Sequence, residues 1–216
     1  MKKLVAVKPH VAALVDYEEE VLKPNEVRIK VHFAAPKHGT EETDFADLSP
    51  FVKEEFNPEW NLFLPRKDGE EPGVKFGDLP LGNMVVGHIT EVGKDVTGFE
   101  VGETVCTYGQ IKETVTVNAI NNHRLLKMKD DTNWKNAVCY DPLQFAISGV
   151  REGQVRVGDN VAVFGLGAIG QLPIQLAKNL EQKLLLVLIQ SNTVVKLLRN
   201  MVRITLLTLL QKMLVS

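Results

Sequence analysis

The chain has 216 residues, of which 24% are charged and 44% are hydrophobic, and its formal net charge is -2 at pH 7. This composition is typical of a globular protein with one large or two small domains, and it excludes disorder as the default. The balanced charge argues against a nucleic-acid or membrane-surface partner. Two cysteines exclude a disulfide scaffold and a four-cysteine zinc lobe. With neither a leader-like start nor an apolar run of membrane-spanning length, we expect a cytoplasmic protein.

The first 120 residues or so have the pattern of a β domain. Apolar and polar residues alternate over residues 27–31, as in a half-buried strand. Six prolines interrupt residues 36–80, and a second apolar block over residues 85–105 is punctuated by glycines. Residues 114–117 are a further strand candidate, and a helix is expected to begin within residues 132–138. Short strands separated by glycine turns predict a small barrel-like β domain.

A strand, a glycine-rich turn and a helix are predicted for residues 160–180. Residues 160–164 form a short apolar run without helical periodicity, which indicates a buried parallel strand. A G-x-G-x-x-G motif follows, made of Gly165, Leu166, Gly167, Ala168, Ile169 and Gly170. In this setting the glycines allow a tight turn and a close approach of a dinucleotide pyrophosphate to a helix N-terminus. Pro173 conflicts with a helix that begins near Ala168, because it removes a backbone hydrogen bond.

These segments together resemble the medium-chain dehydrogenase/reductase superfamily, most closely its zinc-type alcohol, polyol and threonine dehydrogenases. The resemblance implies an α+β to α/β fold, with a GroES-like β-barrel domain followed by the first βα unit of an incomplete Rossmann domain. The expected limits are residues 1–147 for the GroES-like catalytic domain and 148–180 for the start of the Rossmann domain. It also implies NAD or NADP as cofactor and a small alcohol or carbonyl substrate. Family members are usually homo-oligomers.

The zinc ligands of that branch are only partly matched. His38 stands where the family has a cysteine, and Asn83 and Met84 replace the histidine and glutamate of its Gly-His-Glu motif. Asp141 occupies the place of the third ligand. His38, Glu41 and Asp141 could still meet in a cleft, where they would bind a divalent metal or make polar contacts and relay protons. Because a ligand and its neighbour are both replaced, we favour the second interpretation and expect no catalytic zinc.

The composition changes sharply after Glu181. Residues 182–216 carry five basic side chains, no acidic ones and 11 leucines, whereas residues 1–181 carry 20 basic and 27 acidic side chains. A dinucleotide site needs an acidic residue about 20 positions after its glycines, at the end of a second strand. Residues 183–189 are a plausible second strand, but the position expected for the acid is near Leu188.

Two explanations of this tail are open: a diverged sequence or a reading-frame shift. Allowed codons from Leu180 onward, read one base out of frame, encode G-A-E-V-V-I-G-V-D-P-I-K. That reading restores an apolar strand that ends in aspartate, and it favours a frameshift near Asn179. Residues 181–216 are then an aberrant leucine-rich tail.

Three functions follow as alternatives. The first is an NAD(P)-dependent oxidoreductase that transfers a hydride between an alcohol or carbonyl substrate and the cofactor. The second is a non-functional truncated product that retains only a GroES-like β module. The third is a zinc-independent reductase, which Asn83 and Met84 suggest. Cofactor binding separates the second alternative from the others, and metal analysis separates the first from the third.

Overall fold

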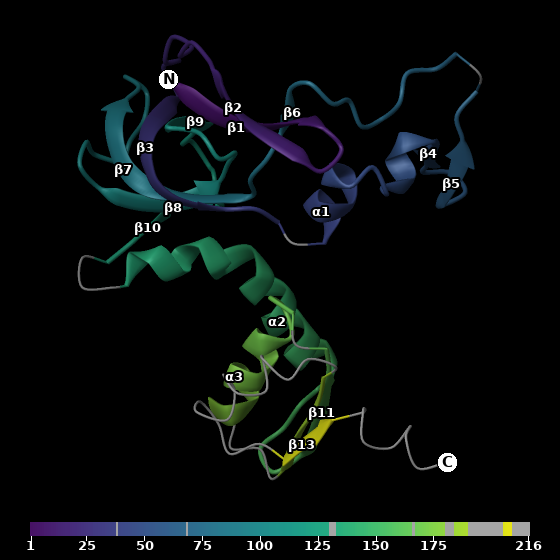
Figure 1. Ribbon diagram of the computed structural model, residues 1–216. Coiled ribbons are helices and arrows are strands. Elements are labelled where there is room, and N and C mark those ends of the chain that lie inside the picture. The colour runs from purple at the N-terminus through teal and green to yellow at the C-terminus, as the bar shows by residue number, and fades with distance from the viewer. Residues whose placement is uncertain are drawn as a thin grey trace. The chain divides into compact units, whose positions relative to one another are not determined.

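The computed structural model describes residues 1–37, 39–67, 69–129, 133–165, 167–179, 184–189 and 205–208. The chain divides into two compact units, Met1–Cys139 and Tyr140–Ser216 (Figure 1). The domain limits expected from the sequence, at residues 147 and 180, stay predictions. Within the described part of the chain, none of the helices has the length and apolar character needed to cross a membrane.

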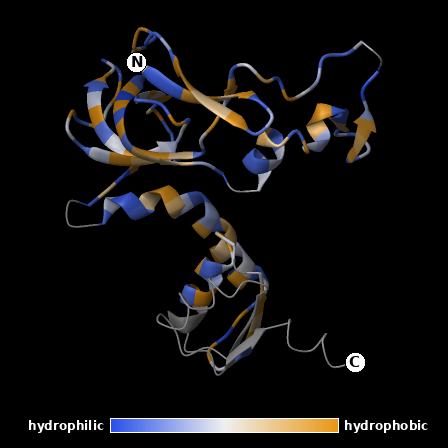
Figure 2. Cartoon of the chain, viewed as in Figure 1, coloured by the Kyte–Doolittle hydropathy of each residue, from blue (hydrophilic) through white to orange (hydrophobic). Residues whose placement is uncertain are grey.

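The first unit is a GroES-like β domain made mainly of two antiparallel sheets. The larger sheet has the strand order β10 (Leu126–Lys127), β8 (Thr104–Tyr108), β7 (Met84–Val92), β3 (Glu26–Ala35) and β9 (Thr114–Asn118). The smaller sheet has the order β2 (Val11–Asp16), β1 (Lys2–Lys8) and β6 (Leu79–Pro80). Figure 2 shows both hydrophobic and hydrophilic residues along these strands, and over residues 27–31 of β3 the sequence alternates with the two-residue period of a half-buried strand.

The core of the barrel comes from the apolar positions that the sequence pattern singles out. Val27, Ile29, Ile89 and Val105 are at most 1% exposed and lie in one cluster. The polar positions of β3 do not all face solvent, because Arg28 is 9% exposed. Its guanidinium contacts carboxylates of Glu19 and Glu91 at 3.2 and 2.7 Å and the Glu20 carbonyl at 2.6 Å. Buried charge is tolerated here because it is paired and hydrogen-bonded.

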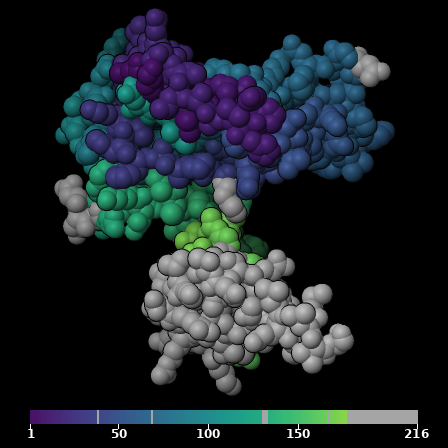
Figure 3. Space-filling view, viewed as in Figure 1, coloured from purple at the N-terminus to yellow at the C-terminus, as the bar shows by residue number. Residues whose placement is uncertain are grey.

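Proline-rich residues 36–80 form only short elements. These are α1 (Thr40–Phe45), a 3₁₀ turn η1 (Pro50–Val52), and the hairpin of β4 (Glu54–Asn57) and β5 (Leu62–Pro65). The hairpin lies apart from the barrel strands (Figures 1 and 3). A second 3₁₀ segment, η2 (Trp134–Cys139), ends the first unit where a helix start was expected.

The second unit contains the expected start of a Rossmann domain. Its elements are α2 (Tyr140–Glu152), β11 (Asn160–Phe164), α3 (Gln171–Asn179), β12 (Leu184–Ile189) and β13 (Thr205–Thr208). The strands are parallel, in the order β11-β12-β13. The second strand confirms the plausible strand of the tail, and β13 was not expected from the sequence. The rest of the proposed out-of-frame segment lies outside the described residues.

The expectation of a buried strand over residues 160–164 is wrong. Val161 and Val163 are half-buried, whereas Ala162 is exposed and Phe164 is 75% exposed. A parallel strand is buried only when helices cover both faces of its sheet. Among the described helices of this unit, α3 contacts β11, and the exposure of Ala162 and Phe164 shows that the strand is not covered on both faces.

Candidate functional site

The glycine-rich turn begins directly where β11 ends, at the carboxyl end of a parallel strand. Gly165 has a φ of +83°, in the left-handed region where a side chain is strained. Leu166 lies outside the described residues. A glycine turn between a parallel strand and a helix is the setting that gives the G-x-G-x-x-G motif its meaning as a dinucleotide site.

The turn continues into α3 without a break. The Gln171 N–H donates to the Gly167 carbonyl at 3.2 Å, and the Leu172 N–H donates to the Ile169 carbonyl at 3.0 Å. The helix N-terminus therefore follows the motif immediately. The partial positive charge at this end of the helix favours an anionic group such as a pyrophosphate.

The helix begins three residues later than the motif suggested, and this resolves the conflict over Pro173. Because α3 starts at Gln171, Pro173 lies in its first turn. N–H groups of a first turn have no partner within their own helix, so a proline there removes no hydrogen bond. Ile174, the next residue, is fully buried. The expected defect is therefore wrong, and α3 is compatible with its sequence.

The second strand of the site lacks its acidic residue. In the parallel register Phe164 pairs with Leu188, so the carboxyl ends of β11 and β12 lie side by side. An acid at the end of β12 would face the ribose of a dinucleotide bound at the glycine turn. The strand ends in Leu188 and Ile189, and the sequence has no Asp or Glu after Glu181. The described residues therefore contain the glycine turn that a dinucleotide site needs, whereas the sequence supplies no acidic residue at the end of β12.

Glu41 connects two loops of the first unit. Its Oε2 accepts the Lys37 N–H at 2.8 Å, and its Oε1 accepts the Gly82 N–H at 2.7 Å. Gly82 has a φ of +120°, and a Cβ there would lie 2.4 Å from the Ile111 backbone nitrogen. Because both oxygens accept backbone hydrogen bonds, the Glu41 carboxylate fixes the backbone at Lys37 relative to the backbone at Gly82.

A cavity of about 360 Å³ adjoins Glu41 and is lined mostly by apolar surface. Its walls come from β1, from α1 and the chain just before it, from the loop after β6, and from the loop between β8 and β9. The lining residues are Leu4, Pro36, Lys37, Glu41, Glu42, Phe45, Leu81 and Ile111. The Glu41 hydrogen bonds therefore shape one wall of an open apolar cavity.

The two positions that replace the family's Gly-His-Glu motif are built into the sheet. Met84 is 1% exposed and pairs with Ala35 and Tyr108 on the neighbouring strands. The Asn83 N–H donates to the Ala35 carbonyl at 2.9 Å, and the Asn83 carbonyl accepts the Gly109 N–H at 2.9 Å. A thioether and an amide are poor zinc ligands beside thiolate, imidazole and carboxylate.

The three candidate catalytic residues are not brought into one described site. Glu41 belongs to the first unit, and Asp141 lies in the first turn of α2 in the second unit, where it is 5% exposed. A carboxylate in this position is stabilised by the helix dipole. His38 lies outside the described residues. Their meeting in a cleft therefore stays a prediction.

Two contacts of the first unit are not predicted by the sequence patterns. One is the contact of Glu41 with Gly82, and the other is a hydrogen-bonded pair of His32 and His88. The signal that could have found the pair is the presence of one histidine at the end of the strand pattern over residues 27–31 and another in the apolar block over residues 85–105.

No protein-family model matches the chain. The D-guloside 3-dehydrogenases of Escherichia coli K12 and Shigella flexneri are each 60% identical to it over 178 residues, which are 82% of this chain and 51% of theirs. The chain belongs to the medium-chain dehydrogenase/reductase superfamily. It spans about half the length of these curated relatives.

Solved structures show that the fold is that of the superfamily. The 2R,3R-butanediol dehydrogenase of Bacillus subtilis has a TM-score of 0.74 at 19% identity, with 98% of this chain and 64% of that chain covered. A mycobacterial protein solved with NADPH has a TM-score of 0.69 at 19% identity, over 96% of this chain and 58% of that one. This superfamily member therefore combines the fold of the GroES-like domain with the start of a Rossmann domain.

We expect Glu41→Ala to lower the free energy of unfolding of this superfamily member by about 1–3 kcal/mol, because two backbone N–H groups lose a charged acceptor. Urea unfolding of the chain measures the change. Glu42→Ala, at the next and exposed position of α1, is the matched control and should change stability by less than about 0.5 kcal/mol. Equal unfolding midpoints for both variants would show that Glu41 has no such role.

Proposed function

We propose that the protein encoded when the reading frame is restored after Asn179, here called the frame-restored protein, is an NAD(P)-dependent dehydrogenase. It transfers a hydride between a secondary alcohol and the cofactor, and its substrate is a glycoside of the D-guloside class. The observation that carries this proposal is the 60% identity to two D-guloside 3-dehydrogenases. The reaction class also agrees with the strand, glycine turn and helix that β11 and α3 form.

The chain's own residues suit the nucleotide part of this reaction. In the proposal, the backbone of Gly165, Leu166 and Gly167 passes close to the pyrophosphate, and Ala168, Ile169 and Gly170 lead to the N-terminus of α3. The left-handed φ of Gly165 and the exposed position of Gly167 support this fit. A nicotinamide cofactor, when bound, supplies the hydride acceptor.

His38, Glu41 and Asp141 are the polar residues that we propose to act on the substrate. Their roles are to bind hydroxyl groups and to relay the alcohol proton. Glu41 contributes by position, because its carboxylate holds the backbone of Lys37, next to His38. Met84 and Asn83 do not fit a catalytic zinc, and the proposed reaction does not depend on that metal.

The test is an assay of the frame-restored protein with NAD⁺ or NADP⁺ and a methyl D-guloside. We expect reduced nicotinamide to form, followed by its ultraviolet absorbance, and substoichiometric zinc by elemental analysis after dialysis. The matched control is the 3-deoxy analogue of the same glycoside, which has no alcohol to oxidise and should give no turnover. Equal rates with both compounds, or no rate with either, would reject the proposal.

A second function fits the 216-residue chain itself. The chain ends its second strand without an acid, and β11 exposes Phe164. Both observations favour a non-catalytic product that keeps the GroES-like β module. Such a product should fold its first unit and fail to bind the cofactor.

A further inference from the structure

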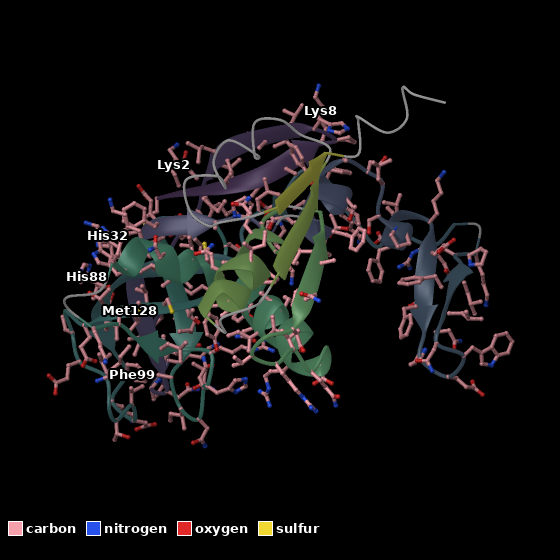
Figure 4. All side chains as sticks on the ribbon, turned by 90° about the horizontal axis from the view of Figure 1, so that it is seen from below. Lys2, Lys8, His32, His88, Phe99 and Met128 are labelled. Atoms are coloured by element: carbon pink, nitrogen blue, oxygen red, sulfur yellow. The ribbon has the colours of Figure 1, made fainter. Side chains whose placement is uncertain are left out.

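The first unit carries a pair of histidines on adjacent strands, remote in sequence from the glycine turn. His32 lies on β3 and His88 on β7, and the Nε2 atom of His32 is 2.8 Å from the Nδ1 atom of His88 (Figure 4). The ring centroids are 4.7 Å apart and the rings are nearly perpendicular, at 88°. One imidazole therefore offers a lone pair toward the other.

The pairing of the strands explains why these rings meet. The register between β3 and β7 shifts between Val31 and Phe33, so His32 has no direct partner across the ladder. Lys30 is opposite His88 in that register. A bulge of this kind changes the direction of a side chain and brings His32 toward His88.

Trp134 of η2 packs against the pair and limits its movement. Its ring contacts His32 edge-on with centroids 5.7 Å apart and His88 with centroids 6.0 Å apart. His32 nevertheless remains exposed and His88 is half-buried. The two nitrogens are thus held together at a place that solvent ions can reach.

The surroundings favour neutral imidazole. Partial burial, and then the charges of His88 and Lys30, hold the pKa of His32 below its ordinary value. Neutral imidazole is the form that binds metals, whereas the charge of Lys30 disfavours any cation held by charge alone.

We propose that His32 and His88 together bind one divalent transition-metal ion of the type that prefers imidazole and a square-planar or octahedral arrangement, namely Ni²⁺ or Cu²⁺. Metal–imidazole bonds of about 2.0–2.1 Å on two nitrogens 2.8 Å apart enclose an angle of about 85°. Adjacent ligands of these geometries are separated by about 90°. A tetrahedral zinc ion would need the nitrogens about 3.3 Å apart.

When both rings are neutral, binding requires no net loss of a proton. The ring that donates the hydrogen bond moves its proton to its other nitrogen, which is Nδ1 in His32 or Nε2 in His88. Both facing nitrogens then present lone pairs, and the rings must turn so that these lone pairs point to one metal ion. Within the described ranges no cluster of three His, Cys, Asp or Glu side chains could hold a metal, so water completes the coordination.

The test is a calorimetric titration of the 216-residue chain with NiCl₂, compared with MgCl₂. We expect one Ni²⁺ site, a loss of affinity of roughly tenfold or more in His32→Ala and in His88→Ala, and no binding of Mg²⁺. His123→Ala, which removes an exposed histidine elsewhere, is the matched control and should bind Ni²⁺ as the parent does.

Two further measurements test the Ni²⁺ or Cu²⁺ site independently of the His32 and His88 variants. Electron paramagnetic resonance of the Cu²⁺-loaded parent chain should show two equatorial nitrogen ligands, a result that needs no folded variant. His38→Ala tests whether Ni²⁺ binds at His38 instead of at the pair of His32 and His88. Loss of the Ni²⁺ site in His38→Ala alone, or unchanged affinity in both His32→Ala and His88→Ala, would overturn the proposal without bearing on the dehydrogenase activity.

Discussion

Gly167→Val in the frame-restored protein is expected to weaken NAD(P) binding by roughly 100-fold or more, equivalent to about 2.7 kcal/mol. The second glycine of the motif allows the backbone to approach the pyrophosphate closely, and a branched side chain would occupy that space. Calorimetric titration with the cofactor measures the loss. Far-UV circular dichroism should stay nearly unchanged, because Gly167 is exposed and precedes α3.

The matched control for this variant is Gly149→Ala on α2, in the same unit. A Cβ at Gly149 has no atom outside its own helix within 4 Å, so it meets open space. We expect its cofactor affinity to equal that of the parent. If Gly167→Val also keeps the parent affinity, the glycine turn is not the pyrophosphate site and the assignment of Gly165 to Gly170 is lost.

The sequence predicts those parts of the fold that depend on local periodicity. Val27 and Ile29 are buried on β3 because alternation with polar residues lets one face of a strand pack on the core. The turn at Gly165 is predictable for a similar reason, since few sequences place three glycines between a strand and a helix. Pro173 was misjudged because the N-terminus of a helix is uncertain by several residues when only the motif is known.

The remaining features depend on contacts between distant residues. The Glu41 hydrogen bond to Gly82 joins positions 41 residues apart, and the pair of His32 and His88 spans 56 residues. The latter also depends on the irregular register after Val31. A periodic pattern contains no information on such a bulge. Phe164 was expected to be buried because its strand has the composition of a covered sheet, whereas coverage depends on later elements.

The 216-residue chain is expected to show no measurable dehydrogenase turnover and no cofactor binding in the micromolar range. The glycine turn after β11 supplies phosphate contacts, yet the carboxyl end of β12 has Leu188 and Ile189 where the ribose acid is needed. Hydride transfer also requires the nicotinamide ring to be positioned on the substrate carbon. Positioning of this kind accounts for about 7–11 kcal/mol of a barrier, and phosphate contacts alone do not provide it.

Comparison of the chain with the frame-restored protein, under the same glycoside assay and cofactor titration, separates the two contributions. The two proteins share residues 1–179, so they have the same glycine turn and the same Glu41 contacts. A rate and an affinity that appear only in the frame-restored protein would assign the loss to the residues after Asn179. Micromolar cofactor binding by the 216-residue chain would instead show that β12 and β13 complete a nucleotide site without the acid, and the frameshift interpretation would lose its functional argument.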